Sequence, residues 1–209
     1  MEEYLNDKEQ WQQVLAWLRE QGPWILGGVA IALAVFGGWH FWQNRIQQRD
    51  LAAATRYQQV MDAFERHDIG GGVQLADGLV KAFPGTAYAD QANLAVARIQ
   101  VESRQLDQAA ARLQQVLSAT RDAELALIAR LRLARVQLAQ GKADDALKTL
   151  DAAKPGAFAA RYAEVRGDAL LAKGDRDGAL KAYREARSGA APTIDTALLD
   201  LKIGELARS

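Results

Sequence analysis

The sequence predicts an all-α protein in which a membrane-spanning helix near the N-terminus is followed by a solenoid of helical hairpins. Residues 21–44 contain no Asp, Glu, Lys or Arg, whereas the chain as a whole has 25% charged residues. After residue 45 the sequence is rich in Ala and Leu and poor in Pro, which favours helix almost throughout. Similar segments recur in this second part at intervals of 33 or 37 residues, which is typical of stacked helical repeats. We therefore expect three parts: a leader (1–22), an anchor (23–45) and a repeat domain (46–209).

The leader predicts a short amphipathic helix. Its apolar residues recur at helical spacing between Tyr4 and Leu18, and Gly22-Pro23 is expected to break the chain after it. Acidic residues outnumber basic ones in this segment, which argues against simple attraction to anionic lipids. A disordered acidic tail is the alternative.

Residues 23–45 predict an uncleaved membrane anchor. A helix over the 24 uncharged residues would be roughly 36 Å long, which exceeds the hydrocarbon thickness of about 30 Å. Trp24 lies at one end of this window, and Trp39 and Trp42 lie at the other, where Trp favours the boundary between lipid and water. The acidic leader and the bulky aromatic end argue against a signal peptide. A buried helix of a globular domain is the remaining alternative.

Small residues follow one face of the predicted anchor. Such a stripe lets a second helix approach closely inside a membrane, although Gly and Ala are also common in membrane helices for no such reason. The candidate packing residues are Gly27, Ala30, Ala34 and Gly38.

The composition argues against an enzyme. The chain has no Cys and only two His, which excludes thiol chemistry and leaves no basis for His-based metal sites or triads. The glycines at 70–72 are not followed by the Lys-Ser/Thr of a phosphate-binding loop. Acidic and basic residues balance at 26 each, with no dense basic patch to indicate nucleic-acid binding. We therefore predict no catalytic residue, no cofactor, no metal site and no nucleic-acid partner.

Three segments of the second part align with one another. The segment "LRLARVQLAQGKADDALKTLDAA" at 131–153 matches "VRGDALLAKGDRDGALKAYREA" at 165–186, with Gly141 over Gly174. An earlier copy, "LAVARIQVESRQLDQAAARLQQV", lies at 94–116. The repetition indicates a helix–turn–helix unit that recurs along the chain.

This pattern resembles the tetratricopeptide repeat, a helix–turn–helix unit of about 34 residues. The last copy matches it most fully, with Gly167 in the first helix and Tyr183 in the second. The earliest copy has Arg104 where the turn Gly is expected. Upstream, we expect one more helix pair that is split by the glycines at 70–72, and we expect a final capping helix near 193–208.

Stacked repeats of this kind have a concave face that binds peptides or protein segments. By their register in the repeats, Arg98, Arg135 and Asp168 are the candidates to point into it. The alternative is that they are ordinary solvated charges.

Together these features resemble the YfgM family, ancillary subunits of the bacterial SecYEG translocon. The resemblance covers essentially the whole chain and rests on the acidic aromatic leader, on "GWHFW" at 38–42, and on the segments 131–151 and 165–175. It implies an inner-membrane protein with a cytoplasmic N-terminus and a periplasmic repeat domain. It also implies association with SecYEG and with the chaperone PpiD, and a link to the response regulator RcsB. No catalytic residue comes with the resemblance.

The charges that flank the predicted anchor favour the opposite orientation weakly. Lys8 and Arg19 precede the anchor, while Arg45, Arg49 and Arg56 follow it, and basic residues tend to stay in the cytoplasm. A difference of one charge decides little, so we follow the family resemblance. The alternative is a cytoplasm-facing scaffold whose repeats sequester a regulator of the RcsB type.

Overall fold

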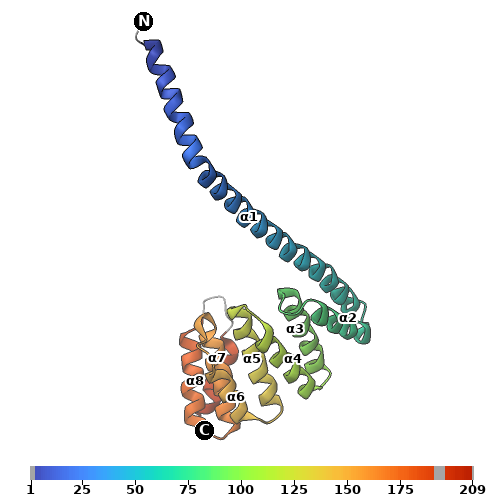
Figure 1. Cartoon of the computed structure of the whole chain (residues 1–209). Helices are drawn as coiled ribbons and strands as arrows, with labels where there is room; N and C mark the ends of the chain where they lie inside the picture. The colour runs from blue at the N-terminus through green and yellow to red at the C-terminus, as the bar shows by residue number, and fades with distance from the viewer. Residues whose placement is uncertain (1–2, 191–195, 209) are drawn as a thin grey trace. The chain divides into compact units, whose positions relative to one another are not determined.

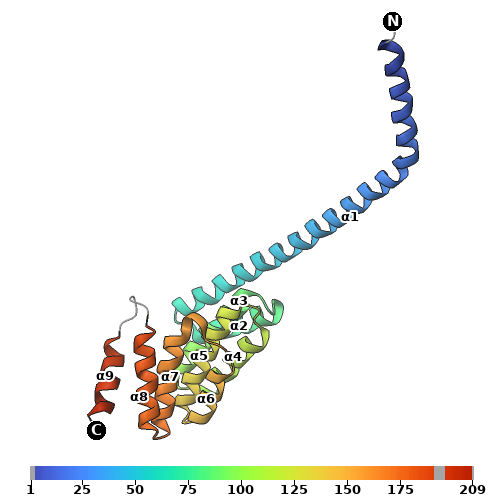
Figure 2. The same cartoon turned by 90° about the vertical axis from the view of Figure 1, so that its left-hand side faces the viewer.

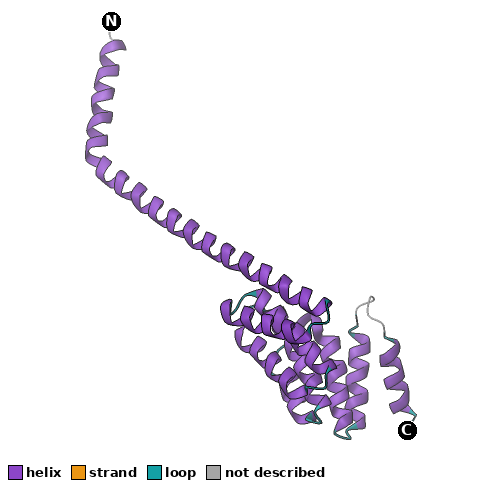
Figure 3. Cartoon of the chain, turned by 90° about the vertical axis from the view of Figure 1, so that its right-hand side faces the viewer, coloured by secondary structure: helices purple, strands orange, loops and turns teal. Residues whose placement is uncertain are grey.

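The computed structural model describes residues 3–190 and 196–208, which contain helices and no strand (Figures 1 and 3). The side chains of residues 3–10, 13, 18, 20, 22, 23, 25, 26, 29 and 30 lie outside the description. The elements in chain order are α1 (Glu3–Glu65), α2 (Ile69–Ala82), α3 (Ala87–Glu102), α4 (Leu106–Ala119), α5 (Ala123–Ala139), α6 (Ala143–Asp151), the 3₁₀ turn η1 (Gly156–Phe158), α7 (Ala159–Ala172), α8 (Arg176–Ser188) and α9 (Ala197–Ala207). The predicted all-α class is confirmed.

The chain divides into two compact units, Met1–Leu51 and Ala52–Ser209. This boundary lies close to residue 46, where the sequence predicts the repeat domain to begin. Because α1 ends at Glu65, its last turns belong to the second unit and its remainder to the first.

From Glu3 onward, where its description begins, the first unit is helical without interruption. The predicted break at Gly22-Pro23 is wrong, because the backbone of α1 continues through both residues. A proline inside a helix removes one backbone hydrogen bond and tends to kink the helix rather than end it when the flanking sequence is helical. Figure 2 shows one bend in the N-terminal, blue part of α1.

The structure does not support the predicted membrane-spanning helix at 23–45. In the part of the chain that is described, no helix is long and apolar enough to cross a membrane. A spanning helix needs about 20 apolar residues. In this window the side chains are described without gaps only from Ile31 onward, and the polar residues His40, Gln43 and Asn44 follow before such a length is reached. The rest of the predicted anchor includes side chains outside the description, namely those of Pro23, Ile25, Leu26, Val29 and Ala30.

The second unit is a stack of helical hairpins with the same turn in each. The end of α1 pairs with α2, α3 with α4, α5 with α6, and α7 with α8, and α9 packs on the last pair. Each hairpin turns through one residue with positive φ: His67 (62°), Arg104 (61°), Gly141 (75°) and Gly174 (85°). The N–H group of the following residue donates to the carbonyl five residues before it in all four turns, over 2.7–3.0 Å. This Schellman arrangement ends one helix and starts the next.

The turn positions confirm the repeats and correct one detail of the sequence analysis. Arg104 occupies the position of the turn Gly in the left-handed conformation, at a cost of about 1 kcal/mol. The first hairpin turns at 66–68 and not at the glycines 70–72, which lie inside α2. Asp68 starts that helix by accepting a hydrogen bond from the Gly71 N–H (2.9 Å), as Asp175 does from Gly178 in α8 (2.9 Å).

Each hairpin buries one residue of its first helix beside one of its second. The four pairs lie seven residues before and nine residues after the positive-φ residue, and all eight residues are buried. The pairs are Val60 with Ala76, Ala97 with Leu113, Ala134 with Leu150, and Gly167 with Tyr183. A larger residue on one helix thus meets a smaller one on the other, which keeps the packed volume similar along the stack.

Candidate functional site

A groove opens between α3 and α5 on the second unit. Its cavity has a volume of about 330 Å³. The lining comes from α3, α4 and α5 and consists of Leu94, Ala97, Arg98, Val101, Leu113, Arg132, Arg135, Val136 and Ala139.

The groove lies where the first helices of two neighbouring hairpins make little direct contact. α5 packs directly against α7, the first helix of the next hairpin, whereas α3 and α5 barely touch. The floor of the groove is therefore the edge of the core that α3, α4 and α5 share. Leu94, Ala97, Leu113 and Val136 belong to that core, and none is more than 7% exposed.

Three arginines surround this apolar floor. Arg132 and Arg135 lie on α5, one helical turn apart, and Arg98 lies on α3. Arg98 pairs with Glu102 over 3.5 Å, and both side chains are largely exposed. Arg132 and Arg135 make no ion pair within the described ranges. No carboxylate lines the groove, so it combines an apolar floor with a cationic rim.

Two of the three predicted binding residues meet in this groove, and the third does not. Arg98 and Arg135 line it from facing helices. Asp168 lies on α7 and takes part in a separate polar network. Arg132 is not among the predicted binding residues, although its spacing of three from Arg135 on one helix places both side chains on the same face.

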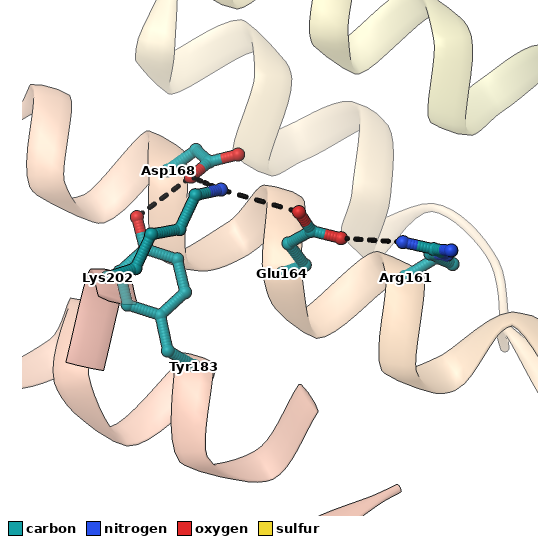
Figure 4. Close-up of polar contacts among 5 residues, drawn as sticks. All are labelled: Arg161, Glu164, Asp168, Tyr183 and Lys202. Atoms are coloured by element: carbon teal, nitrogen blue, oxygen red, sulfur yellow. Dashed lines mark hydrogen bonds and ion pairs between the residues drawn. The ribbon is translucent and has the colours of Figure 1, made fainter. Parts of the chain in front are cut away.

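Asp168 is one of the residues that join the last helix of the stack to the hairpin before it (Figure 4). Its carboxylate accepts hydrogen bonds from the Tyr183 hydroxyl (2.8 Å) and from Lys202 Nζ (2.7 Å). The same ammonium lies 3.3 Å from Glu164 Oε1, and Arg161 approaches the other oxygen of that carboxylate, also over 3.3 Å. Lys202 comes from α9, whereas both carboxylates come from α7, so the network joins these two helices.

Tyr183 is a deeply buried member of this network. Its side chain is 1% exposed, and burial raises the pKa of its hydroxyl well above 10, with the hydrogen bond to Asp168 and the nearby negative charges acting in the same direction. The Lys202 ammonium also lies 5.3 Å from the centroid of the ring. The Tyr183 hydroxyl therefore stays protonated and donates. The network contains no nucleophile beside a base. Its contacts join α9 to α7 and α8, which is a structural role.

The predicted packing stripe lies on the first unit. A Cβ added at Gly27 or Gly38 would meet no atom within 4 Å, and Ala34 is exposed. The side chain of Ala30 lies outside the description. The described face is therefore open to a partner, and the stripe itself stays a prediction.

Comparison with known proteins relates nearly the whole chain to one group. Residues 15–208 match the family model described as a tetratricopeptide repeat-like domain. The ancillary SecYEG translocon subunit of Escherichia coli (strain K12) is 34% identical over 208 residues, which cover 99% of this chain and 100% of that protein. The protein of the same name from Haemophilus influenzae is 29% identical and covers 97% of this chain and 98% of its own length.

Solved structures show the same fold at low sequence identity. MamA residues 41 to the end from Desulfovibrio magneticus RS-1 align with a TM-score of 0.57 and 13% identity, covering 75% of this chain and 89% of that one. Another MamA crystal structure aligns with a TM-score of 0.54 and 17% identity, covering 70% and 83%. With its four hairpin turns, its repeat-like domain over 15–208 and its full-length relatives, the chain belongs to the YfgM family of tetratricopeptide repeat-like ancillary SecYEG translocon subunits.

Proposed function

We propose that this chain is a non-enzymatic ancillary subunit of the SecYEG translocon. The observation that carries the proposal is the relationship over full length to curated proteins with that name. The repeat unit supports a role in protein–protein contacts, because its described part carries a groove with an apolar floor and a rim of arginines. The repeat domain acts through protein–protein contacts with exported chains and with a periplasmic chaperone of the PpiD type.

The first unit holds the protein at the inner membrane. Its described surface carries a cluster of exposed apolar side chains: Ile31, Leu33, Val35, Phe36, Trp39, Phe41 and Trp42 are 58–71% exposed. A contiguous apolar surface of this kind in water is unfavourable and marks a contact with lipid or with another protein. Arg45 lies over the Phe41 ring, 5.2 Å from its centroid, where the apolar run ends. We place the N-terminus in the cytoplasm and the repeat domain in the periplasm.

Protease accessibility tests the orientation. In spheroplasts, added protease is expected to digest residues 52–209 while a cytoplasmic control protein survives. Digestion of the repeat domain only after lysis would contradict the proposed side and would favour the cytoplasm-facing scaffold for a regulator of the RcsB type.

Recovery of the complex tests the small-residue stripe. The triple substitution Ala30→Leu, Ala34→Leu and Gly38→Leu is expected to lower the amount of this chain that co-purifies with tagged SecYEG in mild detergent at least several-fold. Leucine keeps the segment apolar but prevents the close approach that small residues allow. At Gly38 an added Cβ would meet no atom of this chain within 4 Å, so the effect of the substitution is expected to report on a partner.

A matched control keeps the same chemistry on other faces of α1. Leucine replacements at Val35 and Phe36, which are both exposed, are expected to leave the recovery unchanged. If the stripe variant and the wild type are recovered equally, the stripe does not contact SecYEG. The proposed function is tested separately, by whether the wild type itself co-purifies.

A further inference from the structure

The groove between α3 and α5 is chemically specific enough to indicate what it binds. We propose that it takes a segment of an unfolded exported polypeptide in which apolar side chains are flanked by Asp or Glu. This inference deepens the proposed function and rests on it, because that function brings unfolded exported chains to the repeat domain.

The floor of the groove selects apolar side chains. Leu94, Ala97, Leu113 and Val136 offer no hydrogen-bonding side-chain group, and the cavity of about 330 Å³ lies at the lower end of the range for ligand pockets. It accommodates a few aliphatic or aromatic side chains and not a folded domain. An occupant that inserts such side chains also covers Val101 and Ala139, which line the groove and are exposed. It therefore removes apolar surface from water on both partners, which stabilises the complex.

The rim selects negative charge beside those side chains. Arg98, Arg132 and Arg135 are exposed at the edge of the cavity, and no carboxylate lies among its lining residues. The chain carries 26 basic and 26 acidic residues in all, so this rim is a local excess of positive charge. Guanidinium groups bind carboxylates through paired hydrogen bonds. Arg98 can leave Glu102 for a ligand at little cost, because exposed ion pairs contribute little.

An extended peptide meets both requirements at once. Successive side chains of an extended chain point to opposite faces, about 3.3 Å apart along the backbone. When apolar residues enter the floor, their neighbours point away from it and lie near the rim. A segment with Asp or Glu at those neighbouring positions satisfies the arginines, whereas Lys or Arg there is repelled.

Fluorescence polarisation with labelled peptides tests this specificity on the full chain in a neutral detergent. The probes are fluorescein-labelled peptides that alternate Leu with Glu, Leu with Gln, or Leu with Lys. The Glu peptide is expected to bind most tightly and to weaken as salt is added, since salt screens exposed charges. The Gln peptide is expected to bind more weakly and with little response to salt.

Two sets of variants separate the rim from the floor. The triple variant R98Q/R132Q/R135Q is expected to weaken binding of the Glu peptide about tenfold and to leave the Gln peptide unchanged. The control R184Q, which removes an exposed Arg of α8, is expected to change neither. Ala139→Phe fills the groove from an exposed position of its wall and is expected to weaken both peptides without altering the fold.

Equal affinity for the Glu and Gln peptides, or unchanged affinity in the arginine variant, would overturn the inference. Binding of phosphatidylglycerol vesicles through the same arginines, without peptide binding, would also overturn it and make the rim a membrane contact. Co-purification with SecYEG separates this result from a failure of the proposed function. If the chain co-purifies with SecYEG but does not bind the peptides, only the inference is contradicted. If it does not co-purify, the proposed function is contradicted whether or not the peptides bind.

Discussion

Gly167→Ala is expected to lower the free energy of unfolding of the repeat unit by about 2 kcal/mol. A Cβ at this position would lie 2.4 Å from Cε1 of the Tyr183 ring. That ring is 1% exposed, and its hydroxyl is fixed to Asp168 over 2.8 Å, so it has little freedom to move away. Forcing an extra carbon into such a packed site costs about 3 kcal/mol, and the better helix propensity of Ala returns up to about 1 kcal/mol.

The matched control is Gly78→Ala in α2. An added Cβ there meets nothing within 4 Å, and the position is exposed and helical. The control is therefore expected to raise the stability by up to about 1 kcal/mol, in the opposite direction. Thermal unfolding of the full chain, followed by far-ultraviolet circular dichroism, measures both changes. A Gly167→Ala variant that unfolds at or above the wild-type temperature would show that the ring can move.

A second substitution tests whether size matching between the helices is the cause. In the double variant Gly167→Ala/Tyr183→Leu, the fourth hairpin carries the Ala and Leu pair that the second and third hairpins already have at these positions. We expect the double variant to be more stable than Gly167→Ala alone, although the bond to Asp168 is lost. A further loss of stability would contradict the equivalence of the four pairs.

These pairs also show how far the sequence predicts this fold. The helix–turn–helix register follows from Gly141, Gly174 and the small residues around them, because their spacing is regular. The two turn positions also require a positive φ, which favours Gly. The first turn escapes prediction because His67 stands where Gly is expected, while Gly72 replaces the Ala of the later copies. A Cβ at Gly72 would lie 2.3 Å from the Phe64 ring, so this glycine serves packing and not a turn.

The candidate site is predictable only where it depends on register. Arg98 and Arg135 occupy equivalent positions of neighbouring repeats, so the repeat itself places them on one face. The opening between α3 and α5 depends on how closely these two helices pack, which residue spacing does not determine. Asp168 occupies the same repeat position as Arg98 and Arg135 but does not line the groove. Its carboxylate instead binds Lys202 of α9, a helix outside the repeats whose position the repeat pattern does not give.

Lys202→Met is expected to loosen α9 and to lower stability by about 2 kcal/mol. The ammonium lies between two carboxylates, 2.7 Å from Asp168 and 3.3 Å from Glu164. Removing one partner of a buried ion pair costs about 3–5 kcal/mol because the remaining charge is left unpaired. Lys202 is 23% and Asp168 is 34% exposed, so water compensates for part of that loss. Methionine keeps most of the length of the lysine stem, which limits the change to the charge.

The remaining charges explain why the loss is expected to concentrate in α9. Glu164 and Asp168 are four residues apart on α7, a spacing at which like charges repel, and Arg161 then neutralises only Glu164. Amide hydrogen exchange is expected to accelerate in Ala197–Ala207 before it does so in α7 or α8. Lys181→Met, which removes an exposed ammonium from α8, is the control and is expected to change neither exchange nor stability.

A double-mutant cycle decides whether unpaired charge is the cause. Because Glu164→Gln removes the more buried carboxylate, the double variant Glu164→Gln/Lys202→Met is expected to recover part of the stability that Lys202→Met loses. Strict additivity of the two losses would mean that Lys202 does not act through Glu164. Its shorter contact with Asp168 (2.7 Å) and its packing over the Tyr183 ring, 5.3 Å away, would then account for the loss. In either case Lys202 does not hold α9 alone, because Arg187 of α8 pairs with Asp200 over 2.9 Å and Leu199 is buried against the last hairpin. The end of the stack therefore depends on contacts with one hairpin, whereas each interior hairpin is packed on both sides.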